Sequence, residues 1–228
     1  MAERPLAARP RVGVIVPASN GVLEEDLRQH LGDGALVLGA RVRGGRELGE
    51  ELLAAMAVDA RAEVAKLVAA QPAVVAYGCT SGSFFGGPGY ERELAGALQE
   101  AAGAIPLVTA AGALVEELST VGARRVGFAS PYPEDIHARG VAHIGAQGFD
   151  IAANACLGVG DNHAIAQVDD ATLRALVTAV ATHADAVVLS CTGLPTAGRV
   201  RQLRELAGVP VITSNGAIAA AAWRRCPR

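Results

Sequence analysis

Short, continuously apolar runs alternate with amphipathic stretches along this chain, and the series starts again near the middle. The first series of runs is RVGVIVP (11–17), ALVLGARV (35–42), AVVAY (73–77) and IPLVT (105–109). The second series is RVGFAS (125–130), DIAANACL (150–157), AVVLS (186–190) and VPVIT (209–213). Such strands, separated by helices, are typical of parallel sheets covered on both faces. The chain is therefore predicted to have an α/β fold.

The stretches between these runs carry apolar residues at helical spacing. They predict helices at 21–31, 46–69, 89–102, 111–121, 134–147, 171–183, 196–207 and 215–224. Residues 78–88 are rich in Gly, Ser and Pro and are predicted to form a loop.

Three matching segments show that the second series repeats the first. RVGVIVPASN (11–20) matches RVGFASPYPE (125–134), AVVAYGCT (73–80) matches AVVLSCTG (186–193), and IPLVTAAGALVEEL (105–118) matches VPVITSNGAIAAAA (209–222). Three matches in the same order indicate a duplicated α/β unit. We expect two pseudo-symmetric lobes, residues 11–110 and 111–214, with the helix at 215–224 able to pack back on the first lobe. The active site is expected in the cleft between them.

The repeat places two cysteines, Cys79 and Cys191, at equivalent strand ends, and a Thr follows each of them. Open parallel sheets bind ligands beyond the carboxyl ends of their strands. Backbone N–H groups and a helix N-terminus at such a position lower the pKa of a thiol and favour the thiolate. A lone Cys after a buried strand is usually a small core residue, but two at equivalent positions indicate paired function. Cys156 and Cys226 lack this context and are interpreted as structural.

Two thiols that face each other across a cleft can act as nucleophile or base on one side and as acid on the other. Such a pair can invert a stereocentre, or one thiolate can add to an activated double bond and later leave. Both routes pass through an enolate-like intermediate. Thr80, Ser81, Thr192 and Gly193 supply hydroxyl and N–H donors suited to the carboxylate of such an intermediate. These loops contain no arginine, so neutral donors would hold the substrate.

Composition excludes several other classes of function. The net charge of −3 gives no basic footprint for nucleic acid. No apolar stretch approaches the roughly 18–20 residues that span a bilayer, and the N-terminal MAERPLAARP lacks the apolar region of a signal peptide. We therefore expect a cytoplasmic protein whose four Cys are thiols. No CxxC motif occurs, so a structural zinc site is not expected. The single Lys, Lys66, lies mid-helix and is unsuited to a Schiff-base cofactor.

Five short motifs together resemble the aspartate/glutamate racemase superfamily, and within it the maleate cis–trans isomerase branch, with arylmalonate decarboxylase as a relative. The motifs are GVIVPASNGVLEEDL, GCTSGSF, SPY, GVGDN and SCTGLPT, and the match runs from about residue 11 to residue 222. The resemblance implies catalysis by Cys79 and Cys191 without a cofactor. It also implies carboxylate binding by Asn20, Tyr132 and Asn162.

Each of these three residues also has a structural interpretation. Asn20 could cap the helix that follows it, and Tyr132 and Asn162 could serve turns. The sequence departs from the isomerase pattern at Gly21, where the isomerases often have Thr. The decarboxylases have Gly in place of the first cysteine. Because Cys79 is present in this sequence, decarboxylation is less expected.

The function implied by the resemblance is the cis–trans isomerisation of maleate or a related cis-enedioate. Cys79 would form a covalent adduct and Cys191 would act as its acid/base partner. Three alternatives stay open: an amino-acid or hydantoin racemase or epimerase that uses both cysteines as bases, an arylmalonate-type decarboxylase, and a binding protein without turnover. The expected partner is a small carboxylate substrate, and the resemblance implies a homodimer or homotetramer.

Overall fold

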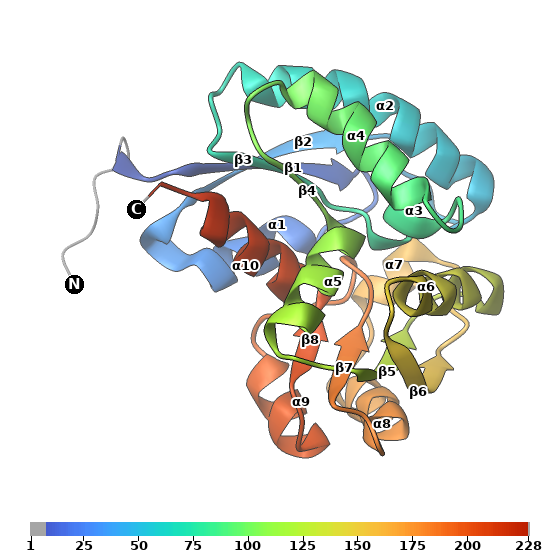
Figure 1. Cartoon of the computed structure of the whole chain (residues 1–228). Helices are drawn as coiled ribbons and strands as arrows, with labels where there is room; N and C mark the ends of the chain where they lie inside the picture. The colour runs from blue at the N-terminus through green and yellow to red at the C-terminus, as the bar shows by residue number, and fades with distance from the viewer. Residues whose placement is uncertain (1–7, 228) are drawn as a thin grey trace.

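A computed structural model describes residues 8–227. Residues 1–7, which belong to the segment used above to argue against a signal peptide, lie outside the described residues, as does residue 228. The chain forms two four-stranded sheets in which all neighbouring strands are parallel. The first sheet has the order β2-β1-β3-β4 and the second β6-β5-β7-β8 (Figure 1). Identical strand order in both sheets confirms the predicted pair of pseudo-symmetric α/β lobes.

The eight strands coincide closely with the eight apolar runs. Their bounds are β1 (Arg11–Pro17), β2 (Leu36–Val42), β3 (Val74–Tyr77), β4 (Leu107–Thr109), β5 (Arg125–Ser130), β6 (Asp150–Cys156), β7 (Ala186–Leu189) and β8 (Val211–Thr213). The central strands β3 and β7 are buried along their whole length, whereas the edge strands β2 and β6 are partly exposed. Burial on both faces explains why the central strands lack an alternating pattern.

The helices agree with the sequence prediction except at short elements and helix starts. They are α1 (Leu23–Leu31), the 3₁₀ turn η2 (Gly32–Gly34), α2 (Glu50–Val68), α3 (Thr80–Phe84), α4 (Tyr90–Ala102), α5 (Ala110–Thr120), α6 (Glu134–Ala146), α7 (Asn162–Ala166), α8 (Asp170–Ala181), α9 (Val200–Ala207) and α10 (Ser214–Arg225). The loop predicted at 78–88 was wrong in part, because α3 lies within it. Both α3 and α7 have five residues, too few to show helical periodicity.

The helices α5 and α10 lie between the two sheets and join the lobes into one core (Figure 1). This core contains Val14 of β1, Leu114 of α5, Val126 of β5 and Ile218 of α10. Although α10 follows the second sheet in the chain, it contacts α1 and β3 of the first. The lobes therefore share apolar packing, and a boundary at residue 110 stays a prediction.

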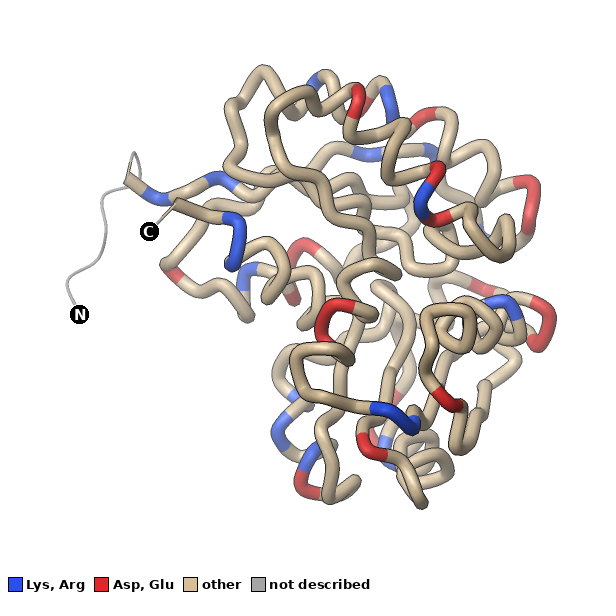
Figure 2. Tube along the Cα trace, viewed as in Figure 1, with Lys and Arg blue, Asp and Glu red and all other residues tan. Residues whose placement is uncertain are grey.

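Charged side chains are spread over both lobes. In the view of Figure 2, Lys and Arg are interspersed with Asp and Glu. Within residues 8–227, no helix combines the length and apolar character that crossing a membrane requires.

Candidate active site

One pocket gathers all of the residues that the sequence analysis singled out. Its lining includes Asn20, Cys79, Thr80, Ser81, Tyr132, Asn162, Cys191, Thr192 and Gly193. These residues follow the carboxyl ends of strands in both sheets, where parallel sheets bind ligands. The cavity measures about 40 Å³, and one water needs roughly 10–15 Å³ on the same scale. The pocket is therefore small but larger than a single water needs, as a site for a small-molecule ligand would be.

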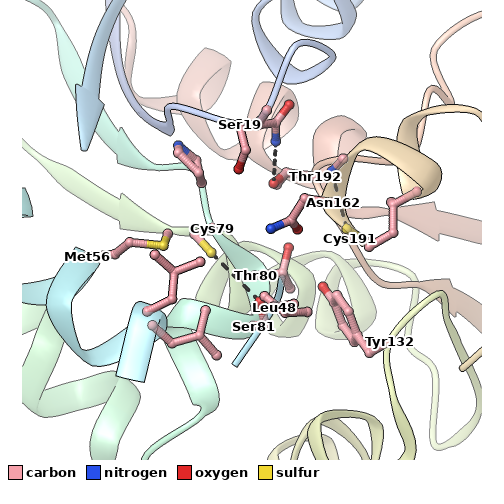
Figure 3. Close-up of a pocket in the computed structure, with 16 residues that line it drawn as sticks. Ser19, Leu48, Met56, Cys79, Thr80, Ser81, Tyr132, Asn162, Cys191 and Thr192 are labelled. Atoms are coloured by element: carbon pink, nitrogen blue, oxygen red, sulfur yellow. Dashed lines mark hydrogen bonds between the residues drawn. The ribbon is translucent and has the colours of Figure 1, made fainter. Parts of the chain in front are cut away.

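The two thiols enter this pocket from opposite sides (Figure 3). Cys79 follows β3, and its Sγ accepts the N–H of Gly82 at 3.3 Å and lies 3.8 Å from Ser81 Oγ. Cys191 follows β7, and its Sγ accepts the N–H of Gly193 at 3.2 Å. Each sulfur is thus held by a backbone N–H from the turn that follows it.

Burial nevertheless dominates the ionisation of both thiols. It raises the pKa of Cys79 above its ordinary value, against the opposing hydrogen bonds from Gly82 and Ser81. It also raises the pKa of Cys191 from 9.0 to about 12, and the Gly193 N–H offsets only part of this. The expectation of lowered thiol pKa values was therefore wrong, because loss of hydration outweighs the N–H bonds. At neutral pH, Cys191 is a thiol and can give a proton.

The threonine after each cysteine bonds across to the other half of the molecule. Thr80 Oγ1 lies 2.9 Å from Ser214 Oγ, at the start of α10. Thr192 Oγ1 donates to the carbonyl of Gly78 at 3.0 Å. Both hydroxyls line the pocket and also link the lobes, so their use as substrate donors stays a prediction.

Asn20 and Tyr132 offer polar groups to the pocket. Asn20 Oδ1 accepts the N–H groups of Val22 and Leu23 at 2.9 and 3.0 Å, which is the capping role considered as its alternative. Its Nδ2 donates one hydrogen to Thr192 Oγ1 at 3.1 Å and keeps a second. Among the described residues, the buried Tyr132 Oη has no hydrogen-bond partner. Burial raises the pKa of Tyr132 well above its ordinary value, so it is a neutral donor.

Asn162 is held by a loop from the first lobe that lies over one side of the pocket. Its Nδ2 donates to the carbonyl of Gly45 at 2.8 Å, and its backbone N–H donates to the carbonyl of Arg46 at 2.8 Å. Arg46 also pairs with Asp161 at 2.7 Å. This inter-lobe connection sets the position of Asn162 and leaves one of its amide hydrogens for a ligand.

The pocket also has an apolar wall that the sequence analysis did not assign to the site. It consists of Leu48, Leu52, Leu53, Met56 and Ile165, and Pro17 and Ser19 complete the lining. Leu48, Leu52 and Met56 belong to the apolar face of the predicted helix at 46–69, and periodicity cannot distinguish a core face from a pocket wall. None of the described residues that line the pocket is Lys or Arg.

Fold and site together define a two-lobed α/β protein with a pair of symmetry-related thiols in a small, largely neutral pocket. The family model for arylmalonate decarboxylase matches residues 12–226. The chain therefore belongs to this family, as its motifs predicted.

Individual relatives come from two branches. A maleate isomerase of Geobacillus stearothermophilus is 28% identical over 92% of this chain and 88% of its own length. An arylmalonate decarboxylase of Bordetella bronchiseptica is 30% identical, with the same coverage of both chains. Among solved structures, a mutant Nocardia farcinica maleate cis–trans isomerase with a covalently bound succinylcysteine intermediate superposes with a TM-score of 0.87. It is 28% identical and is matched over 96% of this chain and 93% of that one.

Proposed function

We propose that this protein is an isomerase that converts maleate, or a closely related cis-enedioate, to its trans isomer through a cysteine adduct. The observation that carries the proposal is the convergence of Cys79 and Cys191 on one small pocket with neutral donors. The maleate isomerases among the relatives, and the succinylcysteine held by one of them, support the same chemistry.

The proposed reaction begins with loss of the Cys79 proton to solvent. The Cys79 thiolate adds to one alkene carbon, so that a C–S bond forms and the C=C π bond breaks. The electron pair moves into the adjacent carboxylate, which becomes an enediolate. Cys191 then protonates the neighbouring carbon, and this gives a succinyl adduct and a Cys191 thiolate. The high pKa of Cys191, about 12, suits it to hold the proton until this step.

Rotation about the new C–C single bond precedes the reverse steps. The Cys191 thiolate removes the proton from the neighbouring carbon, the C=C bond re-forms, and Cys79 leaves as a thiolate. Loss of Cys79 from the rotated adduct gives the trans product. No electrons are gained or lost overall, so the cycle requires no redox cofactor.

Neutral donors are proposed to hold the two carboxylates during this cycle. The groups proposed for this role line the pocket: Tyr132 Oη, the second amide hydrogens of Asn20 and Asn162, and Ser81 Oγ. Thr80, Thr192 and Gly193 are proposed to complete the carboxylate sites while holding the lobes and the Cys191 thiol in place. Low dielectric around the pocket strengthens such hydrogen bonds.

The direct test is to incubate the reduced protein with maleate and follow fumarate by proton NMR. Fumarate formation by wild type that is lost in Cys79→Ala supports the proposal. Absence of conversion by the folded, reduced wild type contradicts it. A parallel reaction in heavy water tests the racemase alternative, in which deuterium enters at Cα of an amino acid or hydantoin without alkene isomerisation.

A second candidate is decarboxylation of an arylmalonate. The apolar wall formed by Leu48, Leu52, Leu53, Met56 and Ile165 favours it, because maleate has no substituent that would fill such a surface. Release of CO₂ from an arylmalonate by both wild type and Cys79→Ala would support this alternative. In that case Cys191 alone would supply the proton.

We further propose that the protein acts in the cytoplasm, without a cofactor, as a homodimer or homotetramer. All four cysteines are free thiols, as expected of a reducing compartment. Light scattering coupled to size-exclusion chromatography would measure the oligomeric state. A monomer at micromolar concentration would contradict that part of the proposal.

A further inference from the structure

A buried carboxylate that the proposed reaction does not use lies just outside the pocket. Asp26 of α1 is 5% exposed. Its Oδ2 accepts the backbone N–H of Thr196 at 2.8 Å, the Thr196 hydroxyl at 3.1 Å and the N–H of Ala197 at 3.1 Å. These partners belong to the loop that follows Cys191 in the other lobe. A buried polar group is costly unless it is hydrogen-bonded, and the hydrogen bonds to Asp26 come from that loop and from α10.

The fully buried Asn215, in the first turn of α10, completes the arrangement. Its Nδ2 donates to Asp26 Oδ2 at 2.8 Å and lies 3.2 Å from the carbonyl of Leu194 and 3.4 Å from that of Thr192. One amide group therefore contacts the carboxylate and two carbonyls of the Cys191 loop. Asp26 and Asn215 together bond to this loop at Thr192, Leu194, Thr196 and Ala197, all within six residues of the thiol.

Among residues 8–227, the first cysteine has no counterpart of this scaffold. The repeat aligns Asn215 with Ala111, whose methyl group forms no hydrogen bonds. Cys79 instead leads directly into the helix α3, whose own backbone fixes the chain. After Cys191 no helix begins until Val200, so the intervening chain depends on side chains for its shape.

We propose that Asp26 and Asn215 are positioning residues that hold the Cys191 thiol at its place in the pocket. They touch neither the pocket nor a ligand, and act through the backbone of residues 191–197. The role of Cys191 in turnover rests on the proposed isomerase function. The placement of its thiol by Asp26 and Asn215 is independent of that function.

The test measures the alkylation of each thiol by iodoacetamide in the folded protein, with peptide mass spectrometry across a pH series. Asn215→Ala introduces alanine, the residue that the repeat has at the equivalent position, Ala111. We expect it to raise the Cys191 rate about fivefold, the equivalent of one lost hydrogen bond, and to leave the Cys79 rate within about twofold. The rate should rise because a released loop exposes the thiol, and the midpoint of its pH profile should fall toward that of a free cysteine.

Asp26→Asn is the conservative variant, because its amide oxygen can still accept bonds from Thr196 and Ala197. It should change the Cys191 rate in the same direction by a smaller factor. Asp185→Asn is the matched control: Asp185 also accepts backbone N–H groups, from Arg124 and Arg125, but at the opposite end of the second sheet. It should leave both thiol rates unchanged, whatever its effect on stability.

Two results would overturn the proposal. One is an unchanged ratio of Cys191 to Cys79 rates in Asn215→Ala, or in Asp26→Asn should Asn215→Ala fail to fold. The other is an equal change in Asp185→Asn. A maleate arm separates this proposal from the proposed function: a positioning defect lowers kcat more than it changes KM. If wild type does not convert maleate, the proposed function fails while the alkylation result still decides the positioning role.

Discussion

The two cysteine corners share an origin in the repeat and differ in how the chain continues. After Cys79 the backbone turns at once into α3, and the sulfur itself caps this helix by accepting the Gly82 N–H. After Cys191 the chain takes an irregular path held by Asp26 and Asn215. Duplication thus supplied two equivalent positions, and divergence of the neighbouring residues gave them different structural support. Sequence symmetry therefore does not extend to the contacts that hold each thiol.

Removing each thiol in turn should separate their roles most strongly. Cys79→Ala should lower maleate conversion by about 10⁴-fold or more, as loss of a nucleophile does. Cys191→Ser should lower it by about 10²–10⁴-fold, as loss of a general acid does. Mass spectrometry should detect an adduct on Cys79 in Cys191→Ser and none in Cys79→Ala. A stable adduct on Cys191 in Cys79→Ala would reverse the proposed assignment.

The pH dependence of alkylation should next reveal the raised pKa of Cys191. Burial raises the pKa of this thiol from 9.0 to about 12. In wild type at pH 8, iodoacetamide should therefore label Cys191 at least about tenfold more slowly than a free cysteine, because the reactive thiolate is a smaller fraction of the residue. Labelling of Cys191 as fast as a free cysteine would contradict this expectation.

The raised pKa of Cys191 also makes the free energy of unfolding depend on pH. Because the Cys191 pKa is raised in the folded state, its contribution to stability is fully present below the ordinary thiol value of 9.0. That contribution is lost as the pH rises from 9.0 toward about 12. Cys191→Ser should lose less stability than wild type over this interval, as measured by urea unfolding. Parallel profiles for the two proteins would rule out this linkage.

The residue before each cysteine also differs: Gly78 precedes Cys79, and Ser190 precedes Cys191. A side chain at Gly78 would place its Cβ 2.3 Å from Leu23 Cδ2 and 2.8 Å from the carbonyl oxygen of Ile15. Gly78→Ser, which copies Ser190 of the other corner, should lower the free energy of unfolding by about 1–3 kcal/mol through overpacking. Ser190→Ala serves as the comparison at the other cysteine. It should change the free energy of unfolding by no more than about 0.5 kcal/mol, because the Ser190 hydroxyl has no hydrogen-bond partner among the described residues. Chemical denaturation of both variants checks this, and equal losses would contradict it.

Loss of the hydrogen bonds that Thr80 and Thr192 make between the lobes should lower the free energy of unfolding modestly. Thr80→Val keeps the shape of the side chain and removes its bond to Ser214, at a cost of about 1 kcal/mol. Thr192→Val removes bonds to both Gly78 and Asn20 and should cost more. A double-mutant cycle of Thr80→Val with Ser214→Ala would measure the coupling. Strict additivity would show that the Thr80–Ser214 bond does not contribute to stability.

The sequence by itself determined the repeat, the strands and the equivalent places of Cys79 and Cys191. These features depend on local apolar runs and on short motifs that recur in order, and both are readable along the chain. The pocket also gathers Asn20, Tyr132 and Asn162, because strand ends of parallel sheets meet at one edge. Short elements such as α3 and α7 escaped prediction, because five residues carry no periodicity.

Only the tertiary structure decided the environment of the thiols. The raised pKa of Cys191 results from burial among elements far apart in the chain, and local motifs predict the opposite direction. The bonds that hold its loop join Asp26 to Thr196 and Asn215, across most of the sequence. The apolar wall formed by Leu52 and Met56 looks like an ordinary core face until the lobes are assembled. Hydration and long-range contacts are properties of the folded chain, so no local pattern could reveal them.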